Sequence, residues 1–177
     1  LSYVGGVLPT GRVARTLLVT MRTEQPAPSR LVAYGVAGEP GRKCALGINH
    51  VVVPFFWGYA ADVTCPDTVN LGCWTCLAAT YDGRVLTLYL NGTPVQSAAV
   101  ALDTPATDLL IGENFVGIVS DVRIWGSALD DSQIAATVFW TFGDVSRASW
   151  RDIPLMGGLL AAAFLLFFLR RFDLNAV

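Results

Sequence analysis

Two closely spaced chain reversals between Cys73 and Val95 constrain the fold more than any other feature of the sequence. In both arms of the first reversal, apolar side chains alternate with polar or smaller ones, which is the period of a half-buried strand. Asp82-Gly83 and Asn91-Gly92 form the two turns, because Gly and Asn tolerate a positive φ angle. The segment therefore predicts two consecutive hairpins, whose core-facing residues are Leu77, Ala79, Tyr81, Leu86, Leu88 and Leu90.

Short strands separated by turns also account for most of the chain before residue 126. Expected strands cover residues 15–22, 30–36, 43–49, 50–56, 58–63 and 95–102, with two more between residues 109 and 125. Many short strands without intervening helices are typical of an antiparallel sandwich. One helix is expected to start at Asp130 to Gln133, which is close to a capping box, with an apolar side formed by Ile134, Ala135 and Val138.

Two ordered blocks of residues resemble the laminin-G-like, concanavalin A-like jelly-roll family. The first contains Trp74, the turn Thr80 to Gly83 and the hairpin Leu88 to Gly92, and the second runs from Leu109 to Leu129. The resemblance covers roughly residues 12–136 and implies an all-β, antiparallel jelly-roll β-sandwich. The chain departs from the family pattern at Cys76, where His is usual, and at Ser120, where Asp is usual.

Residue patterns for catalysis or metal binding are missing from the sequence. Related jelly-roll glycosidases carry Glu-x-Asp-x-x-Glu, whereas Glu24, Glu39 and Glu113 are isolated here. The loop residues Asp67, Asn70, Glu113 and Asn114 suit calcium chemically but match no motif. A single histidine, His50, does not support a zinc site. We therefore expect no enzyme, cofactor or metal, and the formal charge of −2 indicates no nucleic-acid partner.

Four cysteines are compatible with disulfides in an oxidising compartment. Cys73 and Cys76 differ by three positions, so in a strand they point to opposite faces and cannot bridge one another. Cys65 and Cys73 flank a loop that could bring two strand ends together. They are the first candidate pair, and Cys44 and Cys76 are either a second pair or free buried thiols. The motif Cys73-x-x-Cys76 precedes a strand rather than a helix, so it does not predict redox catalysis.

The carboxyl-terminal segment from Ile153 to Leu169 contains no charged side chain. About 17 helical residues span about 25 Å, which is short but sufficient for a bilayer when Arg170 and Arg171 extend to the interface. The segment therefore predicts a single C-terminal transmembrane helix, with lipid as a partner. Small residues at four-residue spacing predict a face that packs on another helix. These helix-packing candidates are Gly157, Gly158, Ala161 and Ala162.

The expected organisation is a jelly roll at 1–138, an aromatic juxtamembrane linker at 139–152, a transmembrane helix at 153–171 and a tail at 172–177. The favoured hypothesis is a non-catalytic interaction module, an accessory subunit of a respiratory, photosynthetic or similar membrane complex. The alternative is a carbohydrate-binding ectodomain of a single-pass membrane protein. The positive-inside rule places the jelly roll on the non-cytoplasmic side, with an organelle inner or thylakoid membrane favoured over the plasma membrane.

Overall fold

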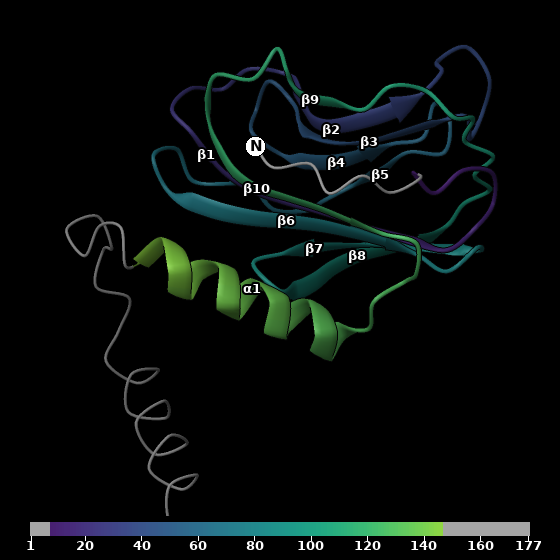
Figure 1. Cartoon of the computed structure of the whole chain (residues 1–177). Coiled ribbons are helices and arrows are strands. Elements are labelled where there is room, and N and C mark those ends of the chain that lie inside the picture. Colours follow the sequence, from purple (N-terminus) through teal and green to yellow (C-terminus); the bar gives the residue numbers. More distant parts are fainter. Residues whose placement is uncertain (1–7, 147–177) are drawn as a thin grey trace, which may run out of the picture. The chain divides into compact units, whose positions relative to one another are not determined.

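The computed structural model describes residues 8–146, and within them two five-stranded antiparallel sheets face each other (Figure 1). The first sheet has the order β10 (Gly117–Trp125), β1 (Arg15–Thr23), β6 (Trp74–Tyr81), β7 (Val85–Leu90), β8 (Thr93–Ala99). The second has the order β5 (Val63–Thr64), β4 (Pro54–Trp57), β3 (Lys43–Ile48), β2 (Ser29–Gly35), β9 (Leu110–Glu113). The predicted all-β antiparallel sandwich is confirmed.

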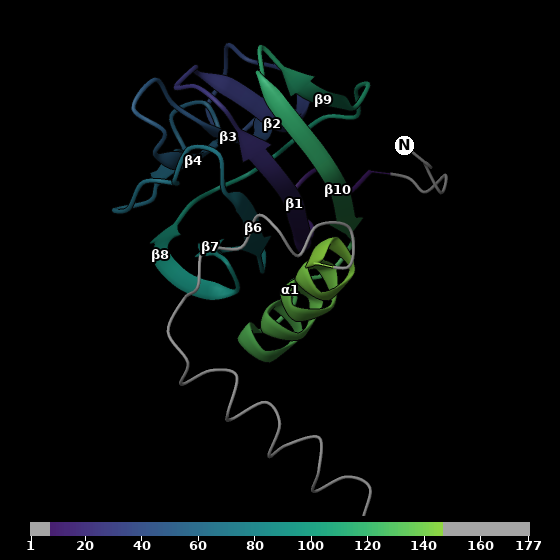
Figure 2. The ribbon, with the colours of Figure 1, turned by 90° about the vertical axis from the view of Figure 1, so that its left-hand side faces the viewer.

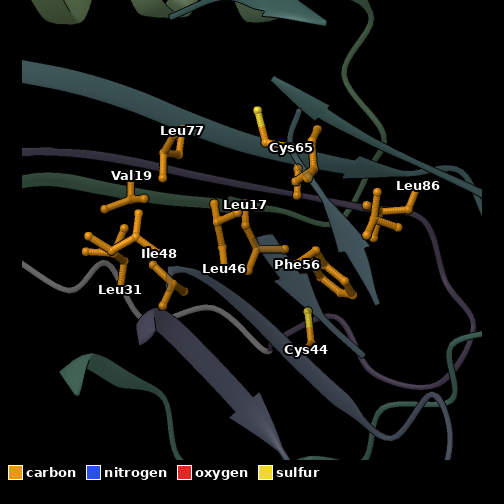
Figure 3. Close-up of a cluster of buried hydrophobic side chains, with 14 of the residues drawn as sticks. Leu17, Val19, Leu31, Cys44, Leu46, Ile48, Phe56, Cys65, Leu77 and Leu86 are labelled. Carbon is orange, nitrogen blue, oxygen red and sulfur yellow. The ribbon is translucent and has the colours of Figure 1, made fainter. Parts of the chain in front are cut away.

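Alternating residues of the two sheets meet in one hydrophobic core (Figure 3). Five of the six predicted inward residues of β6 and β7 belong to this core, and Leu90 packs against it. The second sheet contributes Leu31, Leu46, Ile48 and Phe56, all almost fully buried. Complete burial of such a side chain stabilises the fold by about 1.5–3 kcal/mol. The period-two pattern therefore identified the buried face correctly.

Both predicted turns around β7 are held by side-chain hydrogen bonds. Asp82 Oδ1 accepts from the backbone N–H groups of Val85 at 2.7 Å and Arg84 at 2.8 Å. These two bonds, that of Val85 foremost, lower the pKa of Asp82. Asn91 adopts a φ of 51°, and its Oδ1 accepts from Cys76 N–H at 2.9 Å. The Asn-Gly pair is therefore explained by its role in the turn.

Helix α1 (Asp131–Ser146) starts with the predicted capping box. Asp130 Oδ1 accepts from Gln133 N–H, and Gln133 Oε1 accepts from Asp130 N–H, each at 2.9 Å. Ile134 and Val138 are buried, and Tyr89 Oη donates to Asp131 Oδ1 at 2.8 Å. Figures 1 and 2 show the helix along the first sheet, on the side away from the second.

The predicted strand over residues 58–63 is wrong, because only Val63–Thr64 is extended. Tyr59 and Ala60 have φ angles of 57° and 59°, which a strand cannot accommodate. The preceding expected strand over residues 50–56 starts only at Pro54. Before that point, Asn49 Oδ1 accepts from Val51 N–H and Val53 N–H and holds a turn. The turn held by the Asn49 side chain therefore replaces the strand that the local apolar pattern predicts.

Over residues 8–146, the structure contains no helix of the length and apolarity needed to cross a membrane. The expected transmembrane helix at 153–171 lies outside the described residues, and so do its helix-packing candidates.

Candidate functional site

The outer face of the second sheet carries a cluster of three side chains that lie far apart in the sequence. Arg30 on β2 pairs with Glu113 on β9, so both side chains point to the same face. Trp57 on β4 lies two strands from Arg30, and its neighbour Phe56 points into the core. Alternation therefore places the Trp57 ring on the outer face as well.

Small residues on β3 allow Arg30 to reach Trp57. The strand between them presents Ala45, which pairs with Trp57, and Gly47, which pairs with Arg30. Neither residue has a side chain large enough to block a guanidinium that crosses β3. An added Cβ at Gly47 would also meet Ser29 O at 2.1 Å, so this position requires glycine. The sequence of β3 thus leaves room for the cluster above it.

The Arg30 guanidinium is fixed from two sides. Its Nη1 donates to Glu113 Oε2 at 2.8 Å, and its Cζ lies 4.5 Å from the centre of the Trp57 ring. The Arg30 and Glu113 side chains remain 31% and 37% exposed. An arginine stacked on an indole and paired with a carboxylate loses little further conformational entropy when it binds a ligand. The cluster is therefore a pre-organised polar group beside an aromatic surface.

Tyr59 extends the aromatic surface. Its ring centre lies 6.1 Å from that of Trp57, at an interplanar angle of 47°. A φ of 57° is strained for a bulky residue, and such strain persists only where surrounding contacts hold it. Here Gly41 N–H donates to Tyr59 O at 3.0 Å, and Gly58 N–H donates to Asp62 Oδ1 at 2.9 Å. We name Arg30, Trp57, Tyr59 and Glu113 the sheet-face cluster.

The side chains of the sheet-face cluster are suited to recognising a ligand. It offers partly exposed aromatic rings, guanidinium N–H donors and carboxylate acceptors within one small area. Ligand sites of this kind combine an apolar or aromatic surface with a few fixed polar groups that orient the ligand.

Only one of the residues singled out as calcium candidates belongs to the cluster. Glu113 pairs with Arg30, whereas Asn114 forms the following turn with a φ of 56°. Asp67 and Asn70 lie in the loop before β6, where Asp67 N–H donates to Cys65 Sγ at 3.4 Å. In the part of the chain that the structure describes, no three His, Cys, Asp or Glu side chains gather into a group that could hold a metal.

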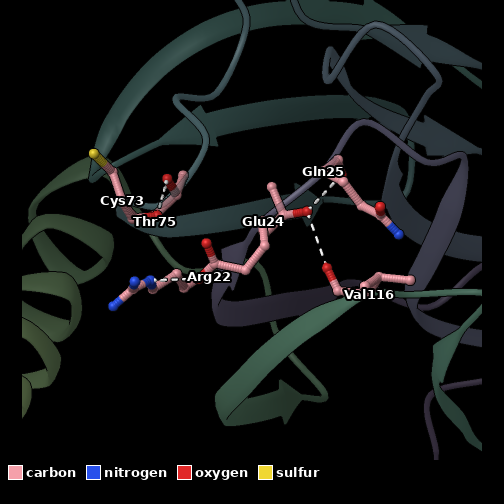
Figure 4. Close-up of polar contacts among 7 residues, drawn as sticks. Arg22, Glu24, Gln25, Cys73, Thr75 and Val116 are labelled. Atoms are coloured by element: carbon pink, nitrogen blue, oxygen red, sulfur yellow. Dashed lines mark hydrogen bonds and ion pairs between the residues drawn. The ribbon is translucent and has the colours of Figure 1, made fainter.

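The four cysteines are free thiols in the structure. Cys44 and Cys65 lie in the core between the sheets (Figure 3). Cys76 points to the opposite side of the first sheet, where burial raises its pKa to about 11. A bond between Cys44 and Cys76 would have to pass through that sheet. Cys73 lies half-buried at one end of the sandwich (Figure 4), and its pairing with Cys65 stays a prediction.

Sequence reasoning did not find Arg30, Trp57 or Tyr59 as site residues. Phe55, Phe56 and Trp57 form a continuous aromatic run, so no apolar-polar alternation indicates which of them faces outward. The approach of Arg30 to Trp57 depends on strand order and on an irregular register between Arg30 and Val32. No local pattern specifies either.

Comparison with known proteins identifies the family. The concanavalin A-like lectin/glucanase superfamily matches residues 21–135 of the chain. Among solved structures, the CBM40 module of a Ruminococcus gnavus IT-sialidase bound to α2,3-sialyllactose has a TM-score of 0.58 at 16% identity. That match covers 71% of this chain and 82% of the module. A candidate carbohydrate-binding protein of Bacteroides ovatus has a TM-score of 0.59 at 19% identity, over 75% of this chain.

The relatives are mostly longer than the part that this chain matches. The chain spans 42% of the Bacteroides ovatus protein. A 48-residue segment is 44% identical to a candidate ABC transporter permease of Methanocaldococcus jannaschii, which is 27% of this chain and 14% of that protein. At the identities of the solved structures, the likeness shows the fold alone. Together with the match over residues 21–135, it shows that the chain belongs to the concanavalin A-like lectin/glucanase superfamily.

Proposed function

We propose that the domain binds carbohydrate through the sheet-face cluster. The observation that carries the proposal is the Arg30 guanidinium, held at 2.8 Å from Glu113 and 4.5 Å from the Trp57 ring on a partly exposed face. A sugar presents an apolar C–H face and a rim of hydroxyls. An aromatic surface beside fixed donors and acceptors matches both parts.

The comparisons support this proposal over the accessory-subunit hypothesis. The CBM40 structure contains a bound sugar, and the Bacteroides ovatus protein is named for carbohydrate binding. The domain also matches 23% of the chain in two structures of Trypanosoma rangeli sialidase, with TM-scores of 0.54 and 0.55. Glu113 is the single carboxylate among the four residues of the sheet-face cluster, whereas glycoside hydrolysis uses a pair of carboxylates, so the cluster suits binding rather than hydrolysis.

A binding titration with a matched pair of variants tests the proposal. The full chain is purified in a polyoxyethylene detergent, because alkyl glycosides would compete for the site, and is titrated calorimetrically with a panel of oligosaccharides. Trp57→Ala should weaken the binding of the best ligand by about tenfold or more, since it removes the aromatic surface. Trp140→Ala, on the exposed side of α1, should leave the affinity unchanged. Equal affinities for wild type and Trp57→Ala would overturn the proposal.

Membrane attachment is a second proposal, and the exposed aromatic residues of α1 favour it. Trp140 is 69% exposed and Phe139 is 43% exposed, with their rings edge to face at 5.5 Å. Aromatic residues of this kind are enriched at membrane–water interfaces, and the uncharged segment 153–169 follows them in sequence. We propose that the chain is a single-pass membrane protein with the sandwich on the non-cytoplasmic side. Digestion of the sandwich by protease added to the cytoplasmic side of sealed membranes would contradict that orientation.

A further inference from the structure

We infer that the sheet-face cluster selects neutral sugars over sugars that carry a carboxylate. This inference rests on the proposed carbohydrate-binding function and specifies the class of ligand. Arg30 and Glu113 form an ion pair at 2.8 Å, so the cation that would attract an acidic sugar is already neutralised by a carboxylate of the protein.

The other basic side chains of β3 and of the turn between β2 and β3 are also bound to acceptors of the protein. Lys43 is almost fully buried, and its Nζ donates to Gly35 O at 3.0 Å. Arg42, in the turn between β2 and β3, pairs with Glu39 at 2.9 Å. The sequences of β4, β5 and β9 contain no Lys or Arg. Each basic side chain of β2, β3 and the turn between them therefore has an acceptor from the protein itself.

Glu113 would directly lower the affinity for an acidic ligand. To reach the Arg30 guanidinium, its carboxylate must either lie beside the Glu113 carboxylate or displace it. The first arrangement places like charges together at a partly desolvated surface, and the second leaves Glu113 without its partner. Both arrangements weaken the binding of acidic sugars relative to the binding of neutral ones.

A neutral sugar can use the ion pair as it stands. Each ring hydroxyl both donates and accepts hydrogen bonds, so neighbouring hydroxyls can accept from guanidinium N–H groups of Arg30 and donate to Glu113. These bonds involve charged partners and are stronger than bonds between neutral groups. Because the ion pair and the Trp57 stack already fix both groups, the protein need not reorganise to form them.

The test uses probe pairs that differ in the acidic group: lactose against α2,3-sialyllactose, and digalactose against digalacturonate. Calorimetry on the full chain in polyoxyethylene detergent gives the ratio of the two Kd values within each pair. Wild type should bind the neutral member about tenfold more tightly or better, and its affinity should change little between about 50 and 500 mM NaCl.

Glu113→Gln removes the negative charge but keeps the shape of the side chain. It should shift the Kd ratio toward the acidic member by about tenfold, and that gained affinity should fall as salt increases. Glu39→Gln is the matched control, because it frees Arg42 in an exposed turn, and it should leave the ratio unchanged. Circular dichroism checks that both variants fold.

The outcomes separate the inference from the function on which it rests. A wild type that prefers the acidic members, or a ratio that Glu113→Gln does not move, would overturn the selection of neutral sugars while carbohydrate binding stands. If wild type binds no oligosaccharide of the wider panel, or if Trp57→Ala binds as well as wild type, the proposed function itself fails.

Discussion

Replacement of Thr16 by valine tests how the segment between β10 and α1 is attached to the sandwich. Thr16 lies on the outer side of β1 and is completely buried. Its Oγ1 accepts from Leu129 N–H at 2.9 Å and donates to Ser127 O at 2.8 Å. Valine has nearly the same shape as threonine but forms neither bond, so the substitution isolates the hydrogen bonds from the packing.

The two lost bonds are not equivalent. Ser127 is exposed, so water can replace the hydroxyl at its carbonyl, and that loss is small. Leu129 is half-buried, so its N–H loses a partner with poorer access to water. One poorly solvated donor plus one weakened bond corresponds to about 1.5–3 kcal/mol. In a chain of this size, that change lowers Tm by about 3–12 °C.

The assay is thermal unfolding of the full chain in detergent, followed by circular dichroism. Thr87→Val is the control, because Thr87 Oγ1 shares a bond of 2.9 Å with Ser97 Oγ on the exposed face of β7 and β8. Loss of that exposed bond should change stability by less than about 0.5 kcal/mol. Equal, small shifts for both variants would refute the role assigned to Thr16.

Four further predictions follow from burial and titration. Leu88→Ala should lower the free energy of unfolding by about 2–5 kcal/mol, and a loss below about 0.5 kcal/mol in a urea titration would contradict its core position. In the reduced native protein, a thiol reagent should label Cys73 first, because the other three thiols are buried; in protein isolated without reductant, the predicted Cys65–Cys73 disulfide would leave Cys73 unlabelled and would give a cross-linked peptide that contains both cysteines. Since burial raises the pKa of Cys76 from 9.0 to about 11, its contribution to stability is complete below pH 9 and is lost as pH rises toward 11, so Cys76→Ala should show a flatter alkaline dependence of Tm. The lowered pKa of Asp82 has the opposite sign: its contribution is present above the ordinary value of 3.8 and is lost in more acidic solution, and Asp82→Asn should remove that dependence.

The sequence allowed prediction of those parts of the fold that local chemistry specifies. Alternation identified the inward face of β6 and β7, and the Asp130–Gln133 capping box located the start of α1. Each of these features is encoded within a few neighbouring residues. The prediction of a strand over residues 58–63 was wrong because Tyr59 and Ala60 adopt a left-handed backbone conformation, which their residue types do not indicate.

The candidate site could not be predicted in the same way. Arg30 and Glu113 are 83 positions apart in sequence, and they meet only because β9 pairs with β2. The approach of Arg30 to Trp57 also depends on the small outward residues of β3 and on the irregular register of β2. Such contacts are set by tertiary topology, whereas the family motifs that made the fold recognisable lie mainly on the first sheet.

Nuclear magnetic resonance of the tryptophan indoles tests the central claim most directly. The chain has five tryptophans, and the indole N–H of each gives its own signal. The full chain, labelled with ¹⁵N in polyoxyethylene micelles, is titrated with the neutral oligosaccharide that binds best. The signal of Trp57 on the second sheet should shift, while those of Trp74 and Trp125 on the first sheet stay in place. Saturable binding that shifts Trp74 or Trp125 and leaves Trp57 unchanged would place the ligand elsewhere and contradict the account.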